Sequence, residues 1–212
     1  MSVFKKTAKD ASREAGVIIG NQMSQNMQTS TNVAVDGMRL FQDKVNSSIV
    51  QNGQFEFYKG NLFEYIEAAK FNTAAARAGS HTRAVVTDAI GRPSDAADIE
   101  LVRDGKVIEQ VQAKFSTSSK AAADSVTMQR STKYQGMQRL IRKDDNYIDT
   151  ATDEHTTLLA KSKALAKNRS EIEGNIYQDQ YKDVYKHLTD ELHSGEITSG
   201  GTTLEEVRAA NE

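Results

Sequence analysis

The chain has 212 residues, of which 38% are hydrophobic and 26% are charged, and this composition suits one packed domain of ordinary size. It contains no cysteine, which excludes disulfides, thiolate zinc sites and a cysteine nucleophile. Its net charge of -2 gives no overall attraction for nucleic acid, so nucleic-acid binding would require a local basic surface. There is neither an apolar run of about 18 residues nor a signal-peptide pattern, so we expect a cytoplasmic protein with no membrane partner.

The first half of the chain is expected to be mainly helical. Residues 1–52 contain two helical stretches, and the second has apolar residues at helical spacing. Residues 61–78 are rich in alanine and end at Gly79, a residue type that often stops a helix. These features predict an N-terminal helical region followed by a separate helix.

The middle of the chain changes to strand patterns. Residues 82–90 contain an Ala-Val-Val-Thr run that favours a strand, and residues 98–102 alternate largely between polar and apolar side chains. Asp104-Gly105 is a strong turn signal, and residues 107–115 form the next strand. We therefore predict an antiparallel hairpin, followed by a short strand over residues 138–142.

The C-terminal third is predicted to be helical, with a flexible joint at Ser199-Gly200-Gly201. Thr203 begins a capping-box pattern for a final helix that is cut short at Glu212, so we expect the chain to be a fragment of a longer protein. Three tyrosines recur at helical spacing, which is more typical of helix packing than of base stacking: Tyr177, Tyr181 and Tyr185. The predicted organisation is therefore an N-terminal helical region (1–52), a core (53–150) and a C-terminal helical region (151–212).

The predicted hairpin gathers three polar side chains. Because side chains on a strand alternate between its faces, Gln112 and Lys114 project to the same side, with Ala113 between them on the other. Pairing through the Asp-Gly turn places Asp98 beside them. A carboxylate, an amide oxygen and a lysine should therefore converge on one patch of the sheet.

This combination of side chains suits phosphodiester cleavage. Mg²⁺ prefers oxygen ligands, commonly one or two carboxylates supplemented by waters and substrate phosphate oxygens. A bound divalent cation polarises the phosphate and activates water. A nearby lysine can orient the water, act as a base or stabilise developing negative charge.

The order of elements resembles the PD-(D/E)xK nuclease superfamily: a helix with Glu, a strand with Asp, then a strand with Gln-x-Lys. The resemblance covers roughly residues 60–145. It implies an α/β restriction-endonuclease-like fold, a mixed central sheet flanked by helices, here with added N- and C-terminal helices. It also implies that Asp98, Gln112 and the Ala113 carbonyl bind Mg²⁺ or Mn²⁺, and that Lys114 serves catalysis.

Two departures from the family pattern bear on the metal site. Ala97 replaces the proline before the aspartate, and Gln112 replaces an acid, which removes one negative charge. Glu100 and Glu109 are alternative nearby carboxylates. Glu100 should share the face of Asp98, whereas Glu109 should point away from Gln112.

The family also often uses a helix glutamate, for which the chain offers two candidates. Glu64 lies in a mostly apolar stripe with Ala68 and Phe71 that should face the sheet. A carboxylate there is costly unless it is paired or metal-bound. Glu67 can instead pair with Lys70 or lie at the surface, so we favour Glu64.

Basic residues follow the predicted site and would hold a nucleic-acid backbone without reading its sequence. The expected contacts are Lys120, Arg130, Lys133, Arg139, Arg142 and Lys143. His81 lies in a polar loop, and the four histidines show no zinc spacing.

The combined interpretation is a metal-dependent endonuclease that hydrolyses DNA phosphodiester bonds. We expect it to act in defence against mobile elements, in conflict between them, or as a toxin-type nuclease. The alternatives are a catalytically inactive nucleic-acid-binding module and a helical assembly module whose terminal helices form a homodimer or larger assembly. RNA as a substrate, and duplex against single strand, stay open at this point.

Overall fold

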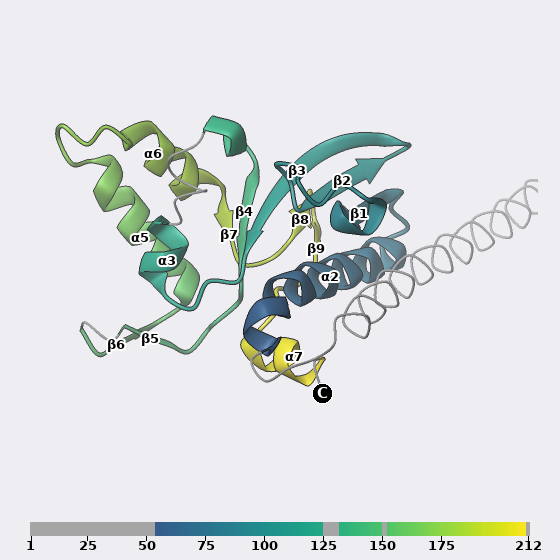
Figure 1. Cartoon of the computed structure of the whole chain (residues 1–212), viewed down its shortest axis with the longest axis horizontal. Helices are drawn as coiled ribbons and strands as arrows, with labels where there is room; N and C mark the ends of the chain where they lie inside the picture. The colour runs from purple at the N-terminus through teal and green to yellow at the C-terminus, as the bar shows by residue number, and fades with distance from the viewer. Residues whose placement is uncertain (1–53, 125–131, 150–151, 211–212) are drawn as a thin grey trace, which may run out of the picture.

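The computed structural model describes residues 54–124, 132–149 and 152–210 (Figure 1). The predicted N-terminal helical region and Arg130 lie outside these ranges. The described chain is built on a mixed five-stranded sheet in the order β1-β2-β3-β4-β7. Its strands are β1 (Thr82–Val86), β2 (Ile99–Arg103), β3 (Lys106–Lys114), β4 (Gln138–Ile141) and β7 (Leu188–Thr189). The first three strands are antiparallel, whereas β3, β4 and β7 run parallel, so the general prediction of a mixed sheet flanked by helices is confirmed.

The helix α2 (Gln54–Arg77) packs with α7 (Leu204–Ala209) and covers one face of the sheet (Figure 1). Its buried side chains, among them Phe63 and Phe71, pack in one cluster with residues of β1 to β4 such as Val111. Gly79 ends the helix as predicted, in a left-handed conformation with φ +65°. This helix is the element that carries both candidate glutamates to the sheet.

A second group of helices packs against the other face, on the left of Figure 1. It consists of α3 (Ser119–Asp124), α5 (Leu158–Ser170) and α6 (Gln178–His187). Ile141 of β4 packs with this group, whereas its neighbour Leu140 packs with α2. Successive residues of β4 therefore face opposite layers, as strand geometry requires.

Shorter elements complete the described chain. Two are 3-10 turns, η1 (Asp88–Ile90) and η2 (Thr132–Tyr134). Two are small hairpins, β5 (Tyr147–Asp149) with β6 (Glu154–Thr156) and β8 (His193–Ser194) with β9 (Ile197–Thr198). Within the ranges that the structure describes, no helix has the length and apolar character needed to cross a bilayer.

The predicted hairpin of β2 and β3 is confirmed. Both turn residues, Asp104 and Gly105, have positive φ (50° and 75°), the conformation that two-residue hairpin turns favour. Ile99 pairs with Val111, and the register shifts between Leu101 and the residue after it. That bulge lies on the turn side of the site, so it leaves Asp98 opposite Gln112.

The C-terminal third contains helices as predicted, α5, α6 and α7, but it also contributes strands that were not predicted. Leu188 and Thr189 form β7, which pairs with β4, and Leu192 is buried in the core with α2. The predicted joint at 199–201 is not a loose linker either: Gly201 is buried, and a Cβ there would lie 2.5 Å from the Asp190 carbonyl oxygen. The segment from β7 to Gly201 therefore packs with the central sheet and α2.

Two smaller predictions for this region are confirmed. The capping box at the start of α7 is present, with the Thr203 hydroxyl accepting from the Glu206 amide and the Glu206 carboxylate accepting from the Thr203 amide. Tyr181 is buried and donates a hydrogen bond to Asp124 (3.2 Å), as expected for a tyrosine that packs helices together.

Candidate active site

Asp98 immediately precedes β2 and is fixed against β3 by hydrogen bonds. Its backbone amide donates to the Val111 carbonyl (2.8 Å), which continues the hairpin pairing by one residue. One carboxylate oxygen, Oδ2, accepts from the Ala113 amide (2.8 Å) and from Nε2 of Gln112. The structure thus brings Asp98, Gln112 and the Ala113 backbone together, as the hairpin argument expected.

Lys114 ends β3, two residues beyond Gln112 and on the same side of the strand. Gln112 is buried, and Lys114 is only partly exposed. The positive charge of Lys114 lowers the pKa of both Glu64 and Asp98, so its ammonium group lies within electrostatic reach of both carboxylates. A strand end holds this lysine more firmly than a surface loop would.

Glu64 comes to the same place from α2. Burial raises the pKa of its carboxyl group well above the ordinary value, the negative charge of Asp98 raises it further, and Lys114 opposes these effects. Burial also raises the pKa of Asp98, against the hydrogen bonds from Ala113 and Gln112 and the positive charge of Lys114. Burial and mutual repulsion disfavour ionisation of these two carboxylates, and a cation bound by both would reverse that preference.

Glu67, the other helix candidate, lies elsewhere. Its side chain is completely buried, accepts a hydrogen bond from Ser199 Oγ, and lies 3.4 Å from the Leu192 amide that also donates to it. The expectation that Glu67 pairs with Lys70 or lies at the surface is therefore wrong, because Lys70 forms its ion pair with Glu206 (2.9 Å). Glu67 holds the C-terminal segment against α2, whereas Glu64 faces the site.

The oxygen atoms available here fit a hard divalent cation. Glu64 and Asp98 supply carboxylates, Gln112 an amide oxygen and Ala113 a backbone carbonyl, which are ligand types that Mg²⁺ and Mn²⁺ accept. Within residues 54–124, 132–149 and 152–210, no group of three or more His, Cys, Asp or Glu side chains could hold a metal ion. Binding would therefore depend on the neutral oxygens of Gln112 and Ala113 and on substrate or water.

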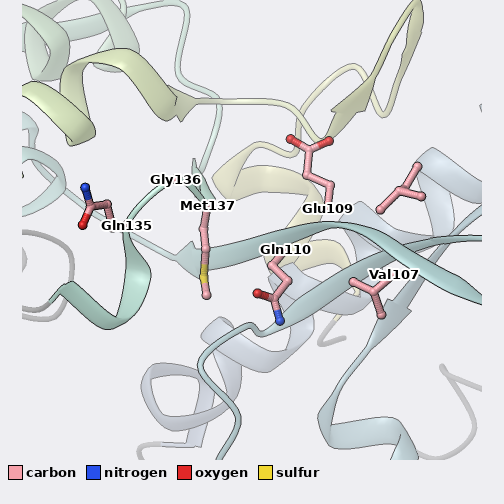
Figure 2. A pocket seen from close by; sticks show the side chains of 7 residues that line it. Val107, Glu109, Gln110, Gln135, Gly136 and Met137 are labelled. Carbon is pink, nitrogen blue, oxygen red and sulfur yellow. The ribbon is translucent and has the colours of Figure 1, made fainter.

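Of the two alternative strand carboxylates, one is paired with an arginine and the other lies at a different pocket. Glu100 is buried and paired with the Arg92 guanidinium through two hydrogen bonds. Glu109 borders a different pocket toward the turn end of β3, together with Gln110 and Met137 (Figure 2). Neither offers its carboxylate to the group around Asp98.

Asp88 is a site neighbour that the sequence analysis missed. It follows β1, and Thr87 before it binds the Asp98 strand: the Thr87 amide donates to the Asp98 carbonyl (2.9 Å). The negative charge of Asp88 contributes to the raised pKa of Glu64. It also helps burial raise the pKa of Tyr65 to about 12. The cause is the antiparallel pairing of β1 with β2, which places the residue after β1 close to the residue before β2 and which no turn motif in the sequence indicates.

Two of the expected nucleic-acid contacts are instead internal. Arg139 is only 1% exposed and pairs with Asp183, and Arg142 is buried. Arg142 Nε donates to the Ser116 carbonyl (2.9 Å), and its guanidinium pairs with Asp144 (2.9 Å). The prediction that these two arginines contact nucleic acid is therefore wrong, because both side chains are used inside the fold.

The remaining basic residues differ in position. Lys120 and Lys133 are exposed, and the charge of Lys133 lowers the pKa of Asp98, so Lys133 lies near the site. Lys143 is half-buried and 3.7 Å from an Asp145 carboxylate oxygen. His81 is exposed beside Asp104 (3.4 Å), as expected for a loop histidine. Among the predicted contacts that lie in the described ranges, Lys133 is thus the one whose charge acts on Asp98.

Comparison with known proteins identifies no relative of this chain. The chain matches no protein-family model, and neither curated proteins nor solved structures give a significant match. The resemblance to the PD-(D/E)xK superfamily therefore depends on the residues themselves and on their arrangement.

Proposed function

We propose that this chain is a metal-dependent endonuclease of the PD-(D/E)xK kind that hydrolyses DNA phosphodiester bonds. The observation that carries the proposal is the hydrogen-bonded group of Asp98, Gln112 and the Ala113 amide on the β2–β3 hairpin, with Lys114 two residues further along the strand. Glu64 of α2 lies close enough that the charges of Asp98 and Lys114 both shift its pKa. These residue types occur in the order and on the elements that the superfamily uses. The mixed sheet flanked by helices agrees with a restriction-endonuclease-like fold.

The proposed reaction joins a water oxygen to phosphorus, with loss of a proton from that water, and breaks one bond from phosphorus to a deoxyribose oxygen, which takes up a proton. A cation held by Glu64, Asp98, Gln112 and the Ala113 carbonyl would supply Lewis-acid polarisation of the phosphate. Lys114 orients the attacking water and stabilises the negative charge that develops on the phosphate oxygens. Hydrogen bonds from Ala113 and Gln112 fix the Asp98 carboxylate before substrate arrives, so little reorganisation is needed.

The partner in this proposal is DNA, held by its backbone. Lys133 is exposed close to Asp98, and Lys120 is exposed on α3 after the strand that carries Lys114. Such lysines attract phosphates without distinguishing bases. Defence against mobile elements, or a toxin-type role, is the setting that we propose for this activity.

The test is cleavage of supercoiled plasmid DNA by the whole chain with Mg²⁺ or Mn²⁺, and with EDTA as the metal-free control. We expect metal-dependent nicking or linearisation that is lost in Asp98→Ala and Lys114→Ala. Glu109→Ala, on the same strand as Lys114 but toward its turn end, is the matched control and should cleave like the wild type. Absence of cleavage of DNA and of RNA with either metal would overturn the proposal in favour of a binding or assembly module.

A further inference from the structure

A pocket lies directly beside Lys114. Its volume is about 430 Å³, and it is lined by Lys59 of α2, by the residues that follow Lys114 in the connection from β3 to α3, and by residues of α3. The lining includes Lys59, Lys114, Phe115, Ser116, Thr117 and Asp124. Lys114 therefore belongs both to the candidate active site and to this pocket, which makes the two continuous.

The pocket lining carries two ammonium groups and one carboxylate. The Lys59 ammonium lies over the Phe115 ring, 5.8 Å from its centre, which is a cation–π contact. The carboxylate, Asp124, is paired with Arg169 and accepts a hydrogen bond from Tyr181 (3.2 Å). Arg169 therefore offsets the only acidic side chain of the lining.

Two other pockets of the described chain have the opposite character. One lies along β3 toward the turn, and its lining has Glu109 as its only charged side chain (Figure 2). The other lies between η2 and α6, where Arg139 faces two carboxylates, those of Asp179 and Asp183. Of these three pockets, the one at Lys114 is the one whose cationic side chains outnumber its acidic ones.

The loop that forms one wall of this pocket is held rigidly. Buried Arg142 donates to the Ser116 carbonyl (2.9 Å), and the Ser119 amide donates to the Tyr147 hydroxyl (3.3 Å). The hydroxyl-bearing residues Ser116 and Thr117 are thus presented by a loop fixed at both ends. A preformed wall loses little conformational entropy when a ligand binds.

The helix α2 connects this pocket to the metal-binding side of the site. Lys59 precedes Glu64 by five residues, which is a rise of about 7.5 Å along the helix. One helix therefore carries both Glu64, whose pKa Lys114 lowers, and Lys59, which lines the same pocket as Lys114. A nucleic-acid strand whose cleaved phosphate lies at Lys114 would continue past Lys59.

We propose that Lys59, with the Ser116-Thr117 wall, binds the backbone phosphate of the nucleotide that flanks the cleaved bond. This inference rests on the proposed nuclease function and adds the path of the DNA strand to it. The contact is with a phosphate and not with a base, because the pocket offers ammonium and hydroxyl groups, which bind backbone oxygens without sequence preference.

The experiment measures binding and cleavage separately, with the whole chain and a fluorescent duplex oligonucleotide. Lys59→Met removes the charge but keeps an unbranched side chain of similar length, and Lys59→Arg keeps the charge. The matched control is Lys106→Met at the turn end of β3, eight residues or about 26 Å from Lys114. Thermal melting of each variant checks that it folds.

In EDTA, where no metal-dependent cleavage occurs, we expect Lys59→Met to weaken binding several-fold and to reduce the slope of log affinity against log salt by about 0.9, the loss of one phosphate contact. With Mg²⁺, KM should rise by a similar factor with kcat almost unchanged, because the contact is made equally in the ground and transition states. Lys59→Arg should restore both values, and Lys106→Met should leave both unchanged.

The outcomes separate this inference from the proposed function. Cleavage by the wild type with identical salt slopes for Lys59→Met and Lys106→Met would overturn the inference and leave the nuclease proposal standing. Binding that depends on Lys59, in a protein that cleaves nothing with any metal, would overturn the nuclease proposal and support this phosphate contact. Absence of both binding and cleavage would overturn both.

Discussion

Replacing Glu64 with glutamine should stabilise the metal-free protein while removing its activity. Burial and the charge of Asp98 raise the pKa of Glu64 in the folded state above its ordinary value of 4.5. At neutral pH the unfolded chain has Glu64 ionised. The folded chain must either keep the carboxylate ionised in its buried position or keep it protonated, and both lower the free energy of unfolding. Glutamine has nearly the same shape and no charge, so Glu64→Gln avoids that cost.

The expected gain is on the order of 1 kcal/mol in the free energy of unfolding, which is roughly 2–4 °C in Tm for a chain of this size. In Mg²⁺ the wild type should become more stable than Glu64→Gln. A ligand that binds only the folded state adds about 2.7 kcal/mol at 100 times its Kd. The wild type should gain this stabilisation, whereas the variant lacks one of its two carboxylate ligands and should gain little.

The assay is thermal melting followed by circular dichroism, in EDTA and in saturating Mg²⁺. Glu67→Gln is the matched control, because it is the same change one helical turn away in a side chain that is buried and bonded to Ser199. Glu67→Gln should keep the Mg²⁺-induced rise in Tm. The reasoning is refuted if Glu64→Gln melts below the wild type in EDTA, or if it responds to Mg²⁺ as fully as the wild type.

Three further predictions concern pH, the buried arginine and a glycine. In EDTA the wild-type Tm should fall as pH rises above about 4.5, because the raised pKa of Glu64 gives the folded state the extra proton, and melts of Glu64→Gln should show a shallower fall. Arg139→Met should lower the free energy of unfolding by about 3–5 kcal/mol in urea titrations, because it removes the buried guanidinium from Asp183, which keeps only the Gly136 amide and His187 as partners. Normal stability with lost DNA binding would contradict that internal role. Gly201→Ala should destabilise by roughly 3 kcal/mol, because its Cβ would meet the Asp190 carbonyl. Gly200→Ala, with a similar φ of +76° but open space, should lose only about 1–2 kcal/mol; equal losses would remove the steric explanation.

The hairpin and the position of Asp98 could be predicted because they depend on local signals. An Asp-Gly turn, alternation along two strands and the distance of each residue from the turn fix which side chains meet. The choice of Glu64 over Glu67 was also local, since Glu64 shares a helical stripe with Ala68 and Phe71. The bulge beyond Leu101 has no local signature, but it lies on the turn side of the site and leaves the pairing at Asp98 intact.

The features that were missed depend on contacts between distant parts of the chain. Arg139 is buried because β4 lies between β3 and β7 and is covered by α6, which supplies Asp183 from 44 residues away. A two-residue strand such as β7 shows no periodicity from which it could be predicted. The role of Asp88 likewise required the pairing of β1 with β2, which no turn signal specified.

The most direct test of the central claim is Mn²⁺ binding by calorimetry, measured beside plasmid cleavage for the wild type, Asp98→Asn and Lys114→Met. If Asp98 holds the cation and Lys114 acts on the water and phosphate, Asp98→Asn should lose both binding and cleavage. Lys114→Met should lose cleavage but still bind Mn²⁺. Binding of Mn²⁺ by Asp98→Asn with wild-type affinity, or cleavage by Lys114→Met at the wild-type rate, would contradict the assignment of this site.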